Sequence, residues 1–431
     1  MPDPTITVDT ASPLDRAKGV STSSSQNANG DENSWELKEQ WAPSTLAVHA
    51  DDAGNYYADV APAMHVSTTF RYDNLEPVDE ENITDPSTLP HIYSRLSSPT
   101  TTRLETLLSA LLHGHAITYT SGLSALHALL VHLSPRVIAI RNGYHGSHGV
   151  LALHRKLNPT LRIVDFAETA WDAAGLGTGD LVHLETPLNP TGEASDIAAM
   201  AARVHARGAY LCVDSTFGPP GLQDPFEQHA DVVLHSGTKY LGGHSDMLCG
   251  VLVVRRREWW AGLVSERVFL GSVMGGLEAW LGVRSLRTLE LRVRRQSESA
   301  EELVAWLAGG LEVAGDAGES DRELIRQTVA RVQHSSLQPP SPWLKAQMPH
   351  GGAPVFALTM RTPDFAKRLP GKLKLFHHAT SLGGVESLIE WRRMSDKNVD
   401  PCLLRVSVGV ESWEDLRGDL RRAMRGLVHE G

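Results

Sequence analysis

From Ile117 to Val254, short apolar runs alternate with longer amphipathic stretches. The runs are AITYT, VIAI, RIVDF, LVHLE, AYLCVD, DVVLHS and GVLVV. Two of the stretches between them, SALHALLVHL and DIAAMAARVHARG, carry apolar residues at helical spacing and stop at Pro135 and Gly208. Because strands that alternate with helices form βαβ units, the pattern predicts an α/β domain with a mostly parallel sheet covered on both faces.

The pattern changes after this region to the long, basic, helical stretch AWLGVRSLRTLELRVRRQSESAEELVAWL, which predicts a connecting helix into a second domain. That smaller α/β domain would hold VFALTMRT and LLRVSVGVES as strands and WEDLRGDLRRAMRGLV as a closing helix. Residues 315–332 show little besides charge and are interpreted as an insertion. Residues 1–34 are rich in Ser, Asn, Asp and Gly, which predicts a disordered tail. The expected division is a tail (1–34), an N-terminal arm (35–70), a large domain (71–285) and a small domain (286–431).

Composition narrows the class of protein. The 431 residues are 41% hydrophobic and 21% charged, as in an ordinary globular protein large enough for two cores. The net charge of -11 argues against nucleic acid as a partner. Three cysteines without CxxC spacing indicate a reducing compartment, and 20 histidines without an HxxxH or HExxH pattern give no reason to expect a metal. With no apolar run long enough to span a membrane and no secretory signal pattern, we expect a cytoplasmic protein that acts on small molecules.

Polar residues gather where the predicted strands end. Ser121, Glu185, Asp214 and Ser236 lie at or just after strand ends, and Lys239 follows three residues beyond the last. Ligands of such sheets bind at the carboxyl ends of the strands, so these side chains are expected to converge on one edge. Taken alone, the stretch LHSGTKYLGGHSD is equally compatible with a surface loop that carries a solvated lysine.

Asp214 precedes Lys239 by 25 residues, about one helix and one strand, so the two can meet at neighbouring strand ends. They could form a structural ion pair. They could also hold pyridoxal phosphate, with the lysine as a Schiff base and the carboxylate beside the pyridine nitrogen. Ser121, Gly122 and Leu123 open a helix, which is either an ordinary N-cap or a phosphate site, and Ser236 and Thr238 could add hydroxyl donors.

Seven motifs in order resemble the pyridoxal-phosphate enzymes of Cys/Met metabolism, the trans-sulfuration family of cystathionine synthases and lyases. They are YSRLSSPTTTRLE, TSGLSAL, ETPLNPTG, VDSTFGPP, HSGTKYLGGHSD, SLGGVESLIE and LLRVSVGVES, and the match runs from STLAVHA near residue 44 to the C-terminus. The resemblance implies a type I fold like that of aspartate aminotransferase, with a mostly parallel large domain and a smaller α/β C-terminal domain. It also implies pyridoxal phosphate as cofactor, an amino acid as substrate, and a homo-oligomer that is at least a dimer and usually a tetramer.

The resemblance assigns roles residue by residue. Lys239 matches the Schiff-base lysine, Asp214 the partner of the pyridine nitrogen, and Tyr144 a tyrosine stacked on the cofactor ring. The residues that match the phosphate binders are Ser121, Gly122, Leu123, Ser236 and Thr238, together with Tyr93 and Arg95, which in this family reach the phosphate of the neighbouring subunit. The residues that match contacts to the ring hydroxyl or the substrate are Asn189, Thr380, Ser381 and Arg405, of which Arg405 grips the substrate α-carboxylate.

Four departures affect the specificity. Thr380 stands where γ-synthases and γ-lyases of the family usually carry Glu and β-lyases Tyr. The segment YHGSH replaces Tyr-Gly-Gly-Thr and brings in His145, and Ser98 replaces an Asn. The segment SLIEWRRMSD lacks the usual Met-Thr-His, and this lack is typical of a divergent branch such as fungal paralogues. His235 and His244 are interpreted as packing or hydrogen-bonding residues, and Glu185 as a residue that supports those around the cofactor.

Two classes of function remain open. The first is carbon–sulfur chemistry on an amino acid, either γ-replacement on an O-acyl-L-homoserine with cysteine to give cystathionine, or elimination from cystathionine by a γ- or β-lyase. The motif SLGGVES resembles the cystathionine enzymes more than the sulfhydrylases of the family, and among the cystathionine enzymes the γ-synthase-like reaction is preferred. The second class is a paralogue that binds the cofactor without turnover.

Overall fold

The computed structural model describes residues 41–55, 58–72, 90–312 and 318–429. The expected tail, the first residues of the arm and part of the segment from 315 lie outside the described residues.

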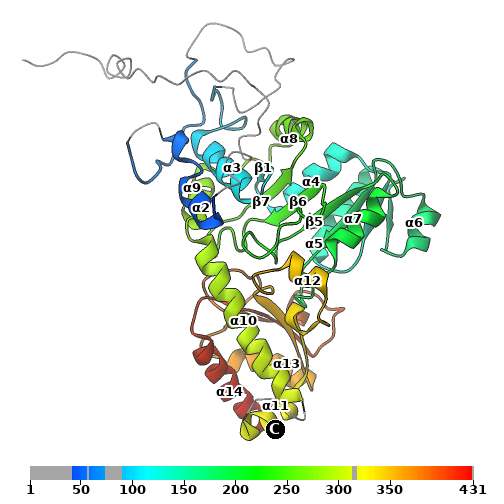
Figure 1. The fold of residues 1–431 in the computed structure, drawn as a ribbon, viewed down its shortest axis with the longest axis vertical. Helices are drawn as coiled ribbons and strands as arrows, with labels where there is room; N and C mark the ends of the chain where they lie inside the picture. Colours follow the sequence, from blue (N-terminus) through cyan, green and yellow to red (C-terminus); the bar gives the residue numbers. More distant parts are fainter. Residues whose placement is uncertain (1–40, 56–57, 73–89, 313–317, 430–431) are drawn as a thin grey trace, which may run out of the picture.

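The large sheet lies in the upper half of the molecule (Figure 1). Among the described residues it has seven strands in the order β1-β7-β6-β5-β4-β2-β3. Their bounds are β1 (His115–Tyr119), β2 (Val137–Ile140), β3 (Arg162–Val164), β4 (Leu181–Glu185), β5 (Tyr210–Asp214), β6 (Val232–Ser236) and β7 (Gly250–Val254). Strands β2 to β6 are parallel, which confirms the predicted mostly parallel sheet, whereas β7 runs antiparallel to both neighbours. The chain returns from β6 to β7 through a loop without a crossover helix, and this permits only antiparallel pairing.

Helices cover both faces of this sheet. They are α3 (Pro99–Leu111), α4 (Gly122–Leu133), α5 (His145–Leu157), α6 (Glu168–Ala174), α7 (Ile197–His205) and α8 (Arg257–Leu270). The Ser121 side chain accepts a hydrogen bond from the amide of Ser124 and so caps α4, which ends where Ser134 takes a left-handed conformation before Pro135. The strand side chains pack into two apolar clusters, one on each side of the sheet.

A long helix joins the two domains. After α9 (Gly276–Leu286), α10 (Leu289–Leu311) runs from the large sheet down beside the small one (Figure 1). Its 23 residues span roughly 35 Å at 1.5 Å per residue. Val293 belongs to the core of the large domain and Ala300 to that of the small domain, so the two cores divide within this helix. The domain limits expected from the sequence remain a prediction.

The small domain holds a mostly antiparallel sheet with the order β10-β11-β12-β9-β8 among the described residues. Its strands are β8 (Val329–Gln333), β9 (Val355–Met360), β10 (His377–His378), β11 (Leu388–Trp391) and β12 (Leu403–Ser407). Its helical segments are α11 (Glu319–Thr328), η5 (Ser335–Leu337), α12 (Pro342–Gln347), α13 (Pro363–Lys372), η6 (Arg392–Met394) and α14 (Trp413–His429). The two predicted strands and the closing helix are present.

The described part of residues 315–332, which the sequence analysis interprets as an insertion, belongs to the small domain. Residues 319–328 form α11, and β8 follows at once and pairs with β9 at the edge of the small sheet. Only Leu324, Ile325 and Thr328 of α11 are buried, and most of β8 is not. The helix is amphipathic but strongly polar overall, so its few apolar positions form no apolar run although they pack against the core.

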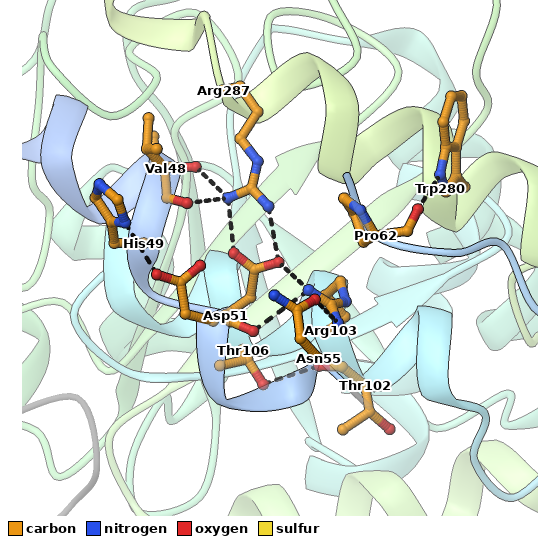
Figure 2. A network of polar contacts seen from close by, with 12 residues as sticks. Val48, His49, Asp51, Asn55, Pro62, Thr102, Arg103, Thr106, Trp280 and Arg287 are labelled. Atoms are coloured by element: carbon orange, nitrogen blue, oxygen red, sulfur yellow. Dashed lines mark hydrogen bonds and ion pairs between the residues drawn. The ribbon is translucent and has the colours of Figure 1, made fainter. Parts of the chain in front are cut away.

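The N-terminal arm begins with α2 (Pro43–His49) and the short η2 (Asp52–Gly54). Figure 2 shows the buried Asp51 between two arginines, Arg287 after α9 and Arg103 on α3. Arg287 donates to both carboxylate oxygens, at 2.7 and 2.8 Å, and Arg103 donates at 2.7 Å. Arg287 also donates to the carbonyl oxygens of Ala47 and Val48. The arm is therefore held against the large domain by a buried, bidentate ion pair.

Candidate active site

A cavity of about 680 Å³ lies at the carboxyl ends of β4, β5 and β6 and is closed on its other side by the small domain. Most of the predicted site residues line it, namely Ser121, Gly122, Leu123, Tyr144, Asn189, Asp214, Ser236, Thr238, Lys239, Thr380, Ser381 and Arg405. The structure thus brings together residues that lie up to 284 positions apart, from Ser121 to Arg405 (405 − 121). This agrees with the expectation that ligands of such sheets bind at the strand ends.

Lys239 follows β6 and reaches across to the small domain. Its Nζ donates to Oγ of Ser381 at 2.7 Å. Burial, followed by the positive charge of Arg405, lowers the pKa of Lys239 to about 8, although Glu390 acts in the opposite direction. The amine is therefore partly unprotonated near neutral pH, as a nucleophile or a base requires.

The segment around Ser381 is shaped to approach the lysine. Ser381 itself has a φ of 79° and Gly383 a φ of 82°. A Cβ on Gly383 would lie 2.9 Å from the backbone nitrogen of Tyr240 and 3.0 Å from the carbonyl carbon of Lys239. Only glycine fits that close approach without strain, and the left-handed conformation of Ser381 is a cost of the kind often found at functional sites.

Two carboxylates end neighbouring strands, the buried Asp214 on β5 and the half-buried Glu185 on β4. Oδ1 of Asp214 accepts from the amide and the hydroxyl of Thr216, at 3.0 and 2.6 Å, and its Oδ2 has no donor among the described residues. Glu185 accepts from the amides of Tyr144 and Asn189, at 2.7 and 2.8 Å. Burial raises the pKa of Asp214, and burial followed by the charge of Asp214 raises that of Glu185 further. A cationic group bound beside Asp214 would offset this cost.

Arg405 lies on β12 at the far side of the cavity. Its guanidinium donates to Oδ1 of Asn189 at 3.2 Å and to the carbonyl oxygen of Ser381 at 2.9 Å, and it pairs with Oε2 of Glu390 at 2.7 Å. The same Oε2 accepts from Arg392 at 2.7 Å. Burial lowers the pKa of Arg405 to about 10, against the effect of Glu390, so the guanidinium is charged at neutral pH.

The opposite end of the cavity is suited to an anion. The hydrogen-bond ladder of α4 begins with the amide of Ala125, which leaves the amides of Gly122 and Leu123 without an intrahelical acceptor. A Cβ on Gly122 would lie 3.3 Å from Ser236, so glycine keeps this approach open. The hydroxyl of Thr238 donates to the carbonyl oxygen of Cys249 at 3.3 Å and accepts from the amide of Cys249 at 3.0 Å.

Some residues singled out in the sequence lie elsewhere. Tyr93 and Arg95 are exposed and do not line the cavity, and Arg95 donates to the carbonyl oxygen of Val268 at 3.2 Å. Ser98 caps α3 and also lies outside the cavity. Since Ser and Asn cap helices about equally well, this departure from the family pattern is conservative for the fold.

The structure also places three histidines singled out in the sequence, together with Thr380 at the mouth of the cavity. His145 lines the cavity beside Tyr144, with ring centroids 4.9 Å apart. His235 is buried, and His244 bonds with the carbonyl oxygen of Gly242 and with Ser285. Thr380 is exposed and lines both the main cavity and an adjoining one of about 360 Å³.

Two residues of the cavity, Glu390 and Arg392, are not predicted from the sequence. Glu390 is the last residue but one of β11, and Arg392 opens η6 two positions later. Residues two apart in an extended chain point to the same side, so this spacing after the SLGG motif was the available clue. Within the described chain, no group of His, Cys, Asp and Glu side chains could hold a metal ion, and no helix has the length and apolar character to cross a bilayer.

Comparison with known proteins identifies the family. Residues 44–425 match the family of Cys/Met metabolism PLP-dependent enzymes, and the chain belongs to it. It is 33% identical to cystathionine gamma-synthase of Mycobacterium tuberculosis, over 89% of this chain and 96% of that one. It is 29% identical to the chloroplastic cystathionine beta-lyase of Arabidopsis thaliana, over 94% and 86%. The crystal structure of a methionine gamma lyase from Micromonospora echinospora superposes with a TM-score of 0.76 at 31% identity, covering 89% of this chain and 99% of that one.

The family establishes pyridoxal phosphate as the cofactor and the type I fold expected from the sequence. The residues present fit that group. A half-buried lysine, a buried carboxylate with a raised pKa and a helix N-terminus with free amides line one cavity. These are the donors and charges that an aldehyde, a pyridine nitrogen and a phosphate require.

Proposed function

We propose that this enzyme catalyses γ-replacement on an O-acyl-L-homoserine with cysteine, which forms cystathionine. The observation that carries the proposal is the convergence of Lys239, Asp214 and Arg405 on one cavity between the two domains. A lysine whose pKa lies near neutral pH, a buried carboxyl group and an oriented guanidinium are the groups needed to bind an amino acid and move its protons. The similar proteins named above are a cystathionine gamma-synthase, a cystathionine beta-lyase and a methionine gamma lyase, which supports chemistry at a carbon–sulfur bond of an amino acid.

The cofactor, when bound, supplies an electron sink for negative charge at the substrate carbons. Lys239 is proposed to hold it and then to take up the proton from Cα of the substrate through Nζ, and Ser381 orients that atom. Asp214 is proposed to hold a proton on the pyridine nitrogen. Tyr144 would cover the ring and Asn189 would contact its hydroxyl group. Ser121, Gly122, Leu123, Ser236 and Thr238 are the proposed phosphate binders.

The substrate would be held at its α-carboxylate by Arg405, which Asn189 and the carbonyl oxygen of Ser381 orient. The distal end would then lie towards Thr380 at the mouth of the cavity. Thr380 is neutral, so it offers no ion pair to a distal ammonium group. An O-acyl homoserine has no distal ammonium, so its own binding does not need that ion pair, whereas cystathionine and the cysteine that replaces the acyl group both carry one.

Two alternatives are kept. Cystathionine γ- or β-lyase activity would use the same lysine and arginine, and its support is the beta-lyase and gamma lyase among the similar proteins. A paralogue that binds the cofactor without turnover would need a defect among these residues. The hydrogen-bonded pair of Lys239 and Ser381 and the position of Asp214 argue against one.

Tyr93 and Arg95 are proposed to act in the cavity of a neighbouring subunit. They are exposed and lie outside the cavity of their own chain, which is consistent with a role across an interface. The planar guanidinium of Arg95 suits a bidentate contact with phosphate. The proposal therefore includes a homo-oligomer that is at least a dimer.

The experiment combines cofactor absorption with product analysis. Purified protein with pyridoxal phosphate should show a visible absorption band that borohydride fixes to Lys239, and Lys239→Ala should lose it. Lys156→Ala, which changes an exposed lysine on α5, is the matched control and should retain it. Wild type should form cystathionine from O-acyl-L-homoserine and cysteine faster than it cleaves cystathionine. A lysine-linked cofactor in Lys239→Ala would overturn the site, and faster cleavage would overturn the direction of the reaction.

A further inference from the structure

Three charged side chains form a connected group on the small-domain side of the cavity. Arg405 is 5% exposed, Glu390 3% and Arg392 6%, and all three line the cavity. Both arginines pair with one oxygen, Oε2 of Glu390, each at 2.7 Å. Nε of Arg392 and Oε1 of Glu390 are buried without a hydrogen-bond partner among the described residues.

The charge of this group is +1, because two guanidinium groups share one carboxylate. A buried charge without a counter-ion is costly, since water is excluded and attraction within the group offsets only part of the desolvation. The group is therefore complete only when one further anion joins it. An amino-acid substrate brings one carboxylate to the same cavity.

Glu390 by itself would work against this binding. A pair of Arg405 and Glu390 alone is neutral, and a substrate carboxylate that approached Arg405 would also approach the negative charge of Glu390. Arg392 removes this conflict by pairing with the same oxygen. The neighbouring Arg393 is exposed, donates to the carbonyl oxygen of Lys397 and does not line the cavity, so it has no such effect.

We infer that Arg392 is a positioning residue for substrate binding: by neutralising Glu390 it leaves Arg405 with a full positive charge for the substrate carboxylate. The inference rests on the proposed binding of an amino acid by Arg405. Arg405 keeps its orientation without Glu390, because Asn189 and the carbonyl oxygen of Ser381 also accept its hydrogen bonds. The effect of Arg392 is thus electrostatic, and it depends on whether Glu390 is charged.

The test is the affinity of the cofactor-loaded enzyme for L-alanine, measured by isothermal titration calorimetry and by the change in cofactor absorption. L-alanine has an α-carboxylate but no leaving group, so its binding does not depend on γ-replacement being the reaction. Ethylamine, the same amine without the carboxylate, is the control ligand. Arg393→Gln is the control variant, because it removes the same charge from the same turn.

Arg392→Gln brings the group to zero charge and should weaken L-alanine binding roughly 10- to 150-fold, the range for a hydrogen bond to a charged group, while ethylamine binding is unchanged. Arg392→Lys keeps the charge and should stay within about threefold of wild type by the same reasoning. The double variant Glu390→Gln/Arg392→Gln returns to +1 and should recover most of the affinity. Glu390→Gln alone reaches +2 and should bind L-alanine more tightly than wild type.

The double variant decides between charge balance and simple packing. If Arg392→Gln binds L-alanine normally, or if the double variant is as weak as the single one, the inference is wrong. Glu390→Gln gives a second, independent test should Arg392→Gln fail to fold, because weaker L-alanine binding by this variant would also refute the inference. Normal L-alanine binding by a wild type that makes no cystathionine would instead refute the γ-replacement proposal alone.

Discussion

Thr380→Glu is the change that bears most directly on the reaction. Thr380 is exposed at the mouth of the cavity, where it also lines the smaller adjoining cavity with Ser245 and Glu386. A glutamate at this position would add a carboxylate where the distal ammonium of cystathionine is expected. The variant should therefore gain in cystathionine cleavage relative to release of the acyl group from an O-acyl-L-homoserine in the absence of cysteine, because that reaction involves no distal ammonium.

The size of the gain follows from the exposure of Thr380. A hydrogen bond between buried charged groups is worth roughly 1.5 to 3 kcal/mol, which would change kcat/KM about 10- to 150-fold. An exposed ion pair is worth only about 0.2 to 1 kcal/mol, since water and salt screen it. Because Thr380 is exposed, we expect the lower range, a relative gain of roughly two- to fivefold. Glu386, which lines the adjoining cavity with it, would reduce the gain further by repulsion.

The assay is steady-state kinetics of wild type, Thr380→Glu and Thr380→Gln on cystathionine and on O-acyl-L-homoserine without cysteine, followed by release of the acyl group, at low and high salt. Thr380→Gln matches the size of glutamate without its charge and should show no relative gain. The gain of Thr380→Glu should shrink as salt rises, as an exposed ion pair requires.

An equal gain in Thr380→Gln would refute the electrostatic reasoning. Efficient cleavage of cystathionine by wild type, with no gain in Thr380→Glu, would mean that another group already receives the distal ammonium and would favour the lyase alternative. Glu386 is a candidate, since it lines the adjoining cavity with Thr380 and accepts a hydrogen bond from Ser245. In that case Glu386→Gln should lower kcat/KM for cystathionine.

Three further predictions concern other parts of the molecule. Asp214→Asn should keep the cofactor but lose most of the kcat, because a neutral amide does not stabilise a protonated ring; near-normal turnover would argue against this role. Arg95→Ala and Lys239→Ala subunits, each inactive alone, should recover roughly a quarter of wild-type activity when they are mixed. Random exchange makes half of the dimers hybrid, and each hybrid dimer has one of its two sites intact. No recovery despite proven exchange would mean that one chain builds the whole site. Burial disfavours the charged form of Asp51, but the hydrogen bonds from Arg287 and Arg103 outweigh burial and lower the pKa of Asp51. The ion pair therefore stabilises the fold above about pH 4, the usual pKa range of an aspartate. This stabilisation is lost as the pH falls through the lowered pKa. Asp51→Asn should therefore cost about 3 to 5 kcal/mol at pH 7, seen as a lower unfolding midpoint, and much less in acid; an equal cost at both pH values would refute this account.

The sequence alone determined which strands form and what they present at their ends. The period and length of an apolar run determine from local sequence whether a strand forms. The residue after the last apolar position lies at the edge of the sheet, whatever place the strand takes in the strand order. Asp214 and Lys239 could therefore be assigned to one edge before any coordinates were known. The predicted sheet, the second domain and its closing helix are present for the same reason. Helix α11 was missed because it is polar overall and its few apolar positions form no apolar run.

Only the tertiary structure decided how the small domain closes the site. The hydrogen bond from Lys239 to Ser381 joins residues 142 positions apart, and that from Arg405 to Asn189 joins residues 216 positions apart. Such contacts depend on the path of α10 and on the packing of two cores, which no local pattern encodes. Arg392 is the sharpest case. A run of two arginines looks like solvated surface in the sequence, but the turn after β11 sends one side chain into the cavity and leaves the other in water. Their charges thus have different consequences because burial, which the fold alone sets, determines how strongly a charge acts.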